Sequence, residues 1–298
     1  MISILIPTYN FNVLPLVENL QKQCESENIV YEILVLDDAS SDAKTVNENS
    51  KINLVKNCNY QILEENIGRS KIRNLLAESA NYNWLLFLDA DTFPSTSAFI
   101  KNYLDTFSNE ISVIFGGITY PKNNSENLSL RHTYGSVRES LPLGARIKNP
   151  YRSFITMGFA IRKEVFHNIK FNENLAGYGY EDAVFGYELQ QNKIPLLHID
   201  NPVVHLNLET NHVFIKKSEL ALQNLLDFHH SKVVDGESVK ILKTYLKLKE
   251  WNLLFLVRGF FNVCRKPILK NLQSSKPSLF LFDLYRLGYL SSLKSKDA

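Results

Sequence analysis

Cysteine is scarce in this chain and long apolar runs are absent, and both features exclude whole classes of protein. Three cysteines occur in 298 residues, and none lies close to another in sequence. This spacing excludes a disulfide scaffold and a structural zinc site, and it suits a reducing compartment. No apolar stretch reaches the roughly 18 residues that a membrane-spanning helix needs, so no such helix is predicted. The first residues lack a basic segment and the apolar run stops at Pro7, so we expect no signal peptide.

Net charge is also small, because 33 Lys/Arg nearly balance 31 Asp/Glu. The balance hides an asymmetry: residues 213–298 carry 15 basic against 7 acidic side chains, whereas residues 1–212 carry 18 against 24. With 45% apolar residues, the chain can bury a sizeable core, which excludes wholesale disorder. We therefore expect a main domain over 1–212 and a basic, helical C-terminal extension over 213–298.

Short apolar runs at 2–6, 33–36 and 84–88 each end in polar residues, and helical patterns at 13–23 and 70–80 separate them. Runs that are apolar on both faces indicate buried parallel strands. Further strands are expected at 112–118 and 154–161, and a helix at 181–191. The pattern predicts an α/β fold with a mostly parallel sheet flanked by helices.

Two other stretches have a different character. Residues 121–152 are rich in Asn and Ser with little periodicity, so we expect a loop with a short helix, and we predict that it closes over a ligand as a lid. Residues 213–293 are predicted to be helical, with breaks near Asp235-Gly236, Pro267 and Pro277.

Acidic side chains follow the predicted strands, where ligands bind in open parallel sheets. Ser40 and Asp42 are typical helix N-cap residues, but N-capping does not explain the sequence L-D-A-D-T. In an extended segment Asp89 and Asp91 would point the same way, as a divalent cation requires. Gly68 and the arginines Arg69 and Arg73, one helical turn apart, would then suit a diphosphate.

Five motifs occur in order: P-T-Y-N at 7–10, L-D-D-A-S-S-D at 36–42, N-x-G-x-x-x-x-R-N at 66–74, L-D-A-D at 88–91 and G-Y-G-Y-E-D-A-V-F-G-Y-E-L at 177–189. Together they resemble the family 2 glycosyltransferases of GT-A (Rossmann-like) fold, which use nucleotide sugars. The resemblance covers about residues 1–210.

The resemblance implies a role for each matching residue. The nucleotide would contact Pro7, Thr8, Tyr9, Asn10, Asp37, Asp38, Asn66, Gly68, Arg69, Arg73, Asp89 and Ala90. Mn²⁺ or Mg²⁺ would bind Asp91, with Asp89 lying toward the ribose or the metal. His205 is either a further metal ligand or a core or surface histidine, and the sequence leaves these interpretations open.

On the acceptor side, the resemblance implies that Asp182 is the general base and that Glu181, Gly179 and Tyr180 bind the acceptor. Transfer would invert the anomeric centre, moving a hexosyl or N-acetylhexosaminyl group from a UDP-sugar or other nucleotide sugar to a hydroxyl of a glycan or lipid-linked glycan. Such chemistry would serve bacterial surface polysaccharide synthesis.

Two other functions stay open, a sugar-phosphate nucleotidyltransferase and an inactive nucleotide- or glycan-binding module. The aromatic, basic tail packs as a helical bundle, contacts a membrane surface peripherally or docks the acceptor, and the sequence leaves these roles open. No motif indicates nucleic acid as a partner. The expected location is the cytoplasm, either free or on the inner face of the cytoplasmic membrane.

Overall fold

The computed structural model describes residues 1–121, 129–173, 179–206 and 209–293. These residues form two compact units. The first comprises 1–121, 140–174 and 188–207, and the second comprises 122–139, 175–187 and 208–298. The second unit thus draws on two earlier segments besides the C-terminal region, and the functional boundary expected at 212/213 stays a prediction.

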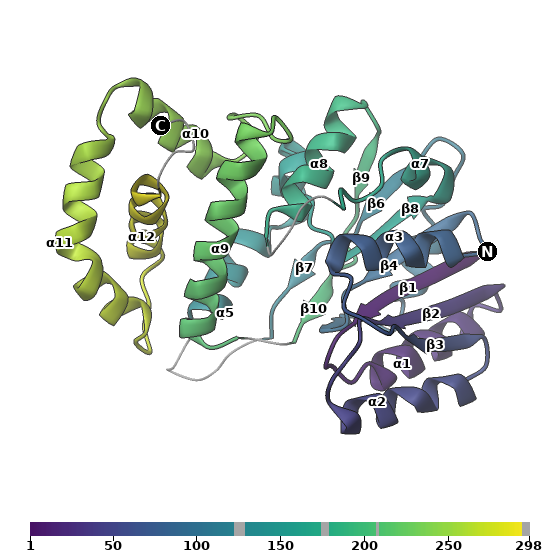
Figure 1. Cartoon of the computed structure of the whole chain (residues 1–298). Helices are drawn as coiled ribbons and strands as arrows, with labels where there is room; N and C mark the ends of the chain where they lie inside the picture. The colour runs from purple at the N-terminus through teal and green to yellow at the C-terminus, as the bar shows by residue number, and fades with distance from the viewer. Residues whose placement is uncertain (122–128, 174–178, 207–208, 294–298) are drawn as a thin grey trace. The chain divides into compact units, whose positions relative to one another are not determined.

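The first unit is built on a mixed seven-stranded sheet of order β3-β2-β1-β4-β8-β6-β9 (Figure 1). Its strands are β1 (Ile2–Thr8), β2 (Tyr31–Asp37), β3 (Cys58–Ile62), β4 (Trp84–Leu88), β6 (Val113–Phe115), β8 (Gly158–Arg162) and β9 (Leu196–His198). β1 pairs in parallel with both β2 and β4, so the carboxyl ends of all three meet at one edge. β8 runs antiparallel to β4 and β6. The mostly parallel sheet expected from the apolar runs is confirmed.

Helices cover both faces of this sheet, with α1 and α2 on one face and α3 on the other (Figure 1). The helices of the unit are α1 (Leu14–Ser26), α2 (Ala43–Ser50), α3 (Arg69–Ser79), α4 (Phe99–Leu104), α6 (Leu143–Lys148) and α7 (Lys163–Asn168), with short 3₁₀ turns η1 (Lys51–Leu54) and η3 (Tyr151–Ser153). Ile4, Leu5 and Leu86 are fully buried between these layers. Their burial explains why the strands read as continuous apolar runs.

A small second sheet of order β5-β10-β7 belongs to the same unit. β5 (Thr92–Pro94) runs antiparallel to β10 (Val203–His205), and β7 (Ile118–Thr119) runs parallel to β10. The apolar run at 112–118, expected to be one strand, is therefore split between the two sheets. Gly116 and Gly117 separate the halves, and Gly117 has a φ of +100°, which favours glycine.

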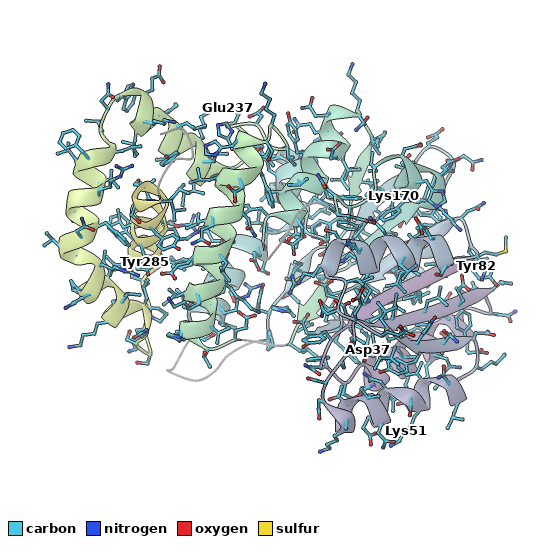
Figure 2. The ribbon with its side chains drawn as sticks, in the orientation of Figure 1. Asp37, Lys51, Tyr82, Lys170, Glu237 and Tyr285 are labelled. Carbon is cyan, nitrogen blue, oxygen red and sulfur yellow. The ribbon has the colours of Figure 1, made fainter. Side chains whose placement is uncertain are left out.

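The second unit is helical. It contains α5 (Leu130–Tyr134), the π-helical turn η2 (Gly135–Glu139), the start of α8 (Glu181–Gln191), α9 (Asn211–His230), α10 (Lys240–Glu250), α11 (Leu254–Leu272) and α12 (Leu279–Ser292). Phe214 of α9, Phe261 of α11 and Phe282 of α12 share one buried cluster. Tyr285 of α12, labelled in Figure 2, donates to the buried Glu219. Burial and this hydrogen bond raise the pKa of Tyr285 to about 12.

Two expectations about helices need correction. Residues 129–152 are largely helical rather than a loop, through α5, η2 and α6, while 122–128 lie outside the described residues, so the lid stays a prediction. Pro267 does not end a helix, because α11 continues through it to Leu272. A proline removes one backbone hydrogen bond, and burial of Ile268 and Leu272 just beyond it stabilises the helix despite that loss. The expected breaks near 235–236 and Pro277 are confirmed.

A buried arginine and histidine join β6 and β9 to the helices beside them. The guanidinium of Arg146 donates to the carbonyls of Phe115, Gly116 and Ile199, and to Nδ1 of His198 at 3.3 Å. Nε2 of His198 lies 3.1 Å from the carbonyl oxygen of Pro150, so a neutral ring that carries its proton on Nε2 satisfies both contacts. Burial and the nearby charge of Arg146 lower the pKa of His198 from 6.5 to about 4.

This environment predicts a pH-dependent loss of stability. Since folding lowers the pKa of His198, the unfolded chain binds more protons between pH 6.5 and about 4, and the stability is lost as the pH falls through that window. The free energy of unfolding should fall by about 3 kcal/mol over the window from this group. Urea unfolding can be followed in a Trp251→Phe background, where Trp84 of β4 reports on the first unit.

His198→Gln should flatten this pH dependence, because the amide does not titrate. His167→Gln, at an exposed position on α7, is the matched control and should leave the slope unchanged. Equal slopes in wild type and His198→Gln would contradict the prediction.

Candidate active site

The acidic pair that ends β2 organises the loops at the carboxyl edge of the sheet. Asp37 is fully buried and accepts from the hydroxyl of Tyr60 at 2.6 Å and from the backbone of Ser40 at 2.8 Å. The two carboxylate oxygens of Asp38 accept from the backbone amides of Ile67 and Gly68, at 2.7 and 3.1 Å. Both carboxylates therefore accept hydrogen bonds from groups of the chain itself, and Asp38 fixes the segment that leads into α3. Figure 2 labels Asp37 at the end of β2.

The loop after β1 is tied to the loop after β2 through Asn10. Its backbone donates to the hydroxyl of Ser40 at 2.6 Å, and its side-chain oxygen accepts from the amides of Ser41 and Asp42. Asn10 has a φ of +50°, a left-handed conformation that asparagine tolerates better than most residues. Between Thr8 and Asn10, the ring of Tyr9 is left 52% exposed at this edge. The loop thus presents a flat aromatic surface beside the acidic pair.

The helix α3 brings a buried arginine to the end of β4. Gly68 precedes the helix with a φ of +83°, and Arg73 lies one turn inside it. Nη2 of Arg73 bonds Oδ1 of Asp89 at 2.5 Å, with the side chains 4% and 18% exposed. Nε of Arg73 is buried and has no hydrogen-bond partner among the described residues. Arg73 therefore sets the orientation of Asp89.

The two aspartates of the L-D-A-D segment have different side-chain partners. The backbone of Thr92 donates to the carbonyl of Asp89 at 3.1 Å, so the chain turns here instead of running extended. Asp89 contacts Arg73, whereas Oδ2 of Asp91 lies 3.2 Å from Nε2 of His205. The extended backbone expected at 89–91 is corrected by this turn, and a shared metal role for the two aspartates stays a prediction.

The small sheet places His205 beside Asp91. His205 pairs with Thr92 in the β5–β10 register, and the next amide, of Leu206, donates to the carbonyl of Asp91 at 2.8 Å. The ring of His205 is 5% exposed and meets the ring of Tyr120 edge to face at 5.5 Å. Burial raises the pKa of Asp91, but the hydrogen bond and charge of His205 and the charge of Arg69 outweigh it, so the net shift is downward. Asp91 is therefore ionised at neutral pH.

The Asp91 and His205 pair fits a divalent cation in part. A carboxylate oxygen and an imidazole nitrogen 3.2 Å apart are close enough to bind one ion. Across the described parts of the chain, no three His, Cys, Asp or Glu side chains are arranged as a metal site. Since Mg²⁺ and Mn²⁺ are commonly bound by few protein ligands together with phosphate oxygens, two donors suffice when a diphosphate supplies the rest. The donor set is compatible with the metal predicted from the sequence.

The acceptor-side motif lies at the start of α8, in the second unit. Gly177 and Tyr178 fall outside the described residues. Gly179 and Tyr180 have φ values of +97° and +68°, so two left-handed residues precede Glu181 and Asp182 in the first helical turn. Tyr180 packs against apolar side chains of α9 and α10, and its hydroxyl accepts from Arg286 at 3.0 Å. Packing fixes the backbone just before the two carboxylates.

Two features of the site escaped the sequence analysis. The edge strand β3 and its Tyr60, which holds Asp37, lie in a run that alternates apolar and polar residues at 58–62, and that alternation was a usable signal. The contact of Tyr120 with His205 has no signal in the sequence.

Gly158, the first residue of β8, packs tightly, since a Cβ there would lie 3.0 Å from Val203. Close packing therefore explains why a glycine occupies this position.

A family model described as glycosyl transferase family 2 matches residues 3–170, more than half of the chain. The chain belongs to this family. The resemblance found in the five motifs is thereby confirmed. The matched region contains every predicted nucleotide-binding residue, and it ends before Asp182 and His205.

Two curated relatives align with parts of this family 2 chain. An uncharacterized glycosyltransferase of Haemophilus influenzae is 33% identical over 95 residues, which is 30% of this chain and 29% of that protein. The teichoic acid poly(glycerol phosphate) polymerase of Staphylococcus epidermidis is 25% identical over 198 residues, which is 64% of this chain and 26% of that protein. The alignments span less than a third of either relative.

Solved structures show that this family 2 chain has a GT-A fold. The mannosyltransferase PcManGT of Pyrobaculum calidifontis, solved with GDP-Man and Mn²⁺, has a TM-score of 0.57 and 14% identity, covering 96% of this chain and 85% of that one. TarS 1–349 of S. aureus, solved with UDP-GlcNAc, has a TM-score of 0.54 and 18% identity, covering 96% and 90%.

The Arg73 and Asp89 pair yields a prediction about stability. Removing one partner of a largely buried ion pair leaves an uncompensated charge, so Arg73→Met and Asp89→Asn should each cost about 2–4 kcal/mol of unfolding free energy. The double variant should lose about 1–3 kcal/mol less than the sum of the singles. Urea unfolding in the Trp251→Phe background measures all three.

The exposed pair of Lys101 and Asp105 on and after α4 is the matched control. Its double-mutant cycle should give less than about 1 kcal/mol of coupling, as exposed pairs do. Additive losses at Arg73 and Asp89 would show that the pair does not stabilise the site.

Proposed function

We propose that the chain transfers a sugar from a nucleotide-sugar donor, a UDP-sugar in the first place, to a hydroxyl of a glycan or lipid-linked glycan, with a divalent cation and inversion of configuration. The observation that carries the proposal is the Asp91–His205 pair at the carboxyl edge of β1, β2 and β4, with the charge of Arg69 acting on Asp91 and the Arg73–Asp89 pair following the same strand β4. Carboxylate, imidazole and guanidinium groups at one edge suit a diphosphate and its counter-ion.

Each residue of the edge has a proposed task. Tyr9 offers its exposed ring to the base, while Pro7, Thr8, Asn10, Asp37 and Asp38 shape the base and ribose site. Asn66, Gly68, Arg69 and Arg73 face the diphosphate, and Asp89 with Ala90 lies toward the ribose. Asp91 and His205 would hold Mn²⁺ or Mg²⁺, which would neutralise the charge that develops on the departing nucleoside diphosphate.

Asp182 is the proposed general base. Its place in the first turn of α8 stabilises a negative charge, and an ionised carboxylate can take the proton of an attacking sugar hydroxyl. Glu181, Gly179 and Tyr180 are proposed to shape the acceptor site around it. Direct attack by the acceptor, without a covalent enzyme intermediate, inverts the anomeric centre.

The comparisons support the donor and acceptor classes. One neighbour of the same fold was solved with UDP-GlcNAc and another with GDP-Man, which supports a nucleotide sugar and leaves the base to experiment. The relative described as a teichoic acid polymerase supports an acceptor in bacterial surface polymers. The family assignment favours sugar transfer over the alternative of nucleotidyl transfer.

The metal assignment predicts how nucleotide binding responds to substitution. Mn²⁺ should tighten UDP binding to the wild type, and Asp91→Asn should lose this gain by about tenfold or more, with a smaller loss in His205→Gln. Calorimetric titration of UDP and of GDP, with Mn²⁺ or with a chelator, measures both effects.

Asp105→Asn, an exposed aspartate in the same unit, is the control and should bind as the wild type does. If Asp91→Asn keeps full metal-dependent affinity, the metal assignment is wrong.

The base assignment predicts a loss of turnover without a loss of binding. Asp182→Asn should stay folded and bind UDP with Mn²⁺, yet release UDP about 10²-fold more slowly in the presence of acceptor. Glu188→Gln, later on the same helix, is the matched control and should keep near-normal turnover. The configuration of the product can be read by NMR.

Near-normal turnover in Asp182→Asn, or a product of retained configuration, would contradict the proposed base. A wild type that binds nucleotide but releases neither UDP nor pyrophosphate with any acceptor would indicate an inactive binding module instead.

A further inference from the structure

The helix α11 has two apolar faces, and the bundle uses one of them. Phe261, Ile268 and Leu272 are buried in the cluster shared with α5, α9 and α12. The other face, which we name the outer face, consists of Phe255, Leu256, Phe260 and Val263, with exposed fractions of 67%, 57%, 50% and 79%.

The outer face is a continuous stripe. Its residues recur at helical spacing over two turns, so their side chains lie on one side of α11. Trp251, directly before the helix, is 63% exposed. Surfaces that face only water rarely expose three large aromatic side chains to this extent within ten residues. Such a patch marks an interaction site.

Basic residues far outnumber acidic ones in the stretch of sequence that contains this stripe. Residues 240–272 carry eight Lys/Arg and a single acid, Glu250. Arg258 bonds the carbonyl of Ser291, and Arg265 lies near Glu219. Lys247, Lys266 and Lys270 have no ion-pair partner among the residues that the structure describes, so their charges face solvent.

We propose that the outer face of α11 binds the surface of an anionic lipid bilayer, with the helix lying in the plane of the interface. Aromatic and aliphatic side chains enter the boundary between headgroups and acyl chains, and lysines extend toward anionic headgroups. Charge decides the occupant: a second copy of this face would bring two basic surfaces together, whereas an anionic bilayer complements both the apolar stripe and its basic border.

The geometry also limits the mode of binding. In the described part of the chain, no helix is long and apolar enough to cross a bilayer. Because the exposed apolar side chains occupy one side of α11, the proposed attachment is interfacial and reversible, and it weakens with salt since part of its energy is electrostatic. Membrane binding of this kind requires no sugar transfer, so it stands or falls independently of the proposed catalytic activity.

Vesicle flotation of the full chain tests the proposal. The wild type should float with phosphatidylcholine vesicles containing about 30 mol% phosphatidylglycerol and much less with phosphatidylcholine alone. Raising NaCl from about 0.1 M to about 0.5 M should weaken the binding. Phe255→Ser combined with Phe260→Ser and Val263→Ser should reduce the partition coefficient about tenfold or more, and Lys266→Glu with Lys270→Glu should act on anionic vesicles alone.

Matched controls separate these effects from general changes in hydrophobicity and charge. Leu54→Ser removes an 88% exposed leucine of the first unit, and Lys22→Glu with Lys44→Glu changes two exposed lysines there. Both should float like the wild type. All substituted positions are exposed, and circular dichroism with thermal melting checks that each variant is folded.

Three results would overturn the proposal. These are failure of the wild type to float with anionic vesicles, unchanged flotation of the Phe255/Phe260/Val263 variant, and a concentration-dependent dimer in light scattering that the same variant abolishes. The last result would identify a second copy of the chain as the occupant.

Discussion

Two hydrogen bonds from the loop before α3 to the carboxylate of Asp38 link the end of β2 to the start of a helix. Because Gly68 donates one of them and immediately precedes α3, the position of the helix is set at its first turn. Arg73 then meets Asp89 at the end of β4, and the turn from Asp89 to Thr92 carries Asp91 to His205. A change at Asp38 is therefore expected to shift the whole series of contacts along the carboxyl edge of the sheet, although its own carboxylate accepts only from backbone amides.

The strands whose positions depend on burial of apolar residues can be predicted from the sequence. Most residues of strands β1, β2 and β4 are buried, so their apolar runs identify the strands and the polar residues that follow identify the candidate site. The orientation of Asp89 and Asp91 is not readable in this way, because a turn and an extended segment of four residues have the same composition. Pro267 shows the same limit: a local preference for ending the helix is overridden by burial of residues that lie far away in sequence.

In the C-terminal region, one aromatic-rich sequence pattern is compatible with two different roles. Its aromatic content is compatible with a packed helical bundle and with binding to a bilayer surface. No feature of the sequence distinguishes these two roles. In the structure, Phe261 and Ile268 on one face of α11 are buried in the bundle. Phe260 and Val263 on the other face are exposed to solvent. Lys266 and Lys270 of the same helix are exposed, so their charges do not have to be buried.

Two histidines on strands that follow one another along the chain, β9 and β10, show why residue type alone does not identify a ligand. His198 and His205 are equally buried, at 5% exposed each. His198 lies beside the guanidinium of Arg146, which disfavours a proton or a cation on Nδ1, while Nε2 is committed to a backbone carbonyl. His205 turns Nε2 toward a carboxylate that is ionised at neutral pH, which favours positive charge between the two groups. The sign of the neighbouring charge therefore separates a structural histidine from a candidate metal ligand, and that sign is set by strand register rather than by any local motif.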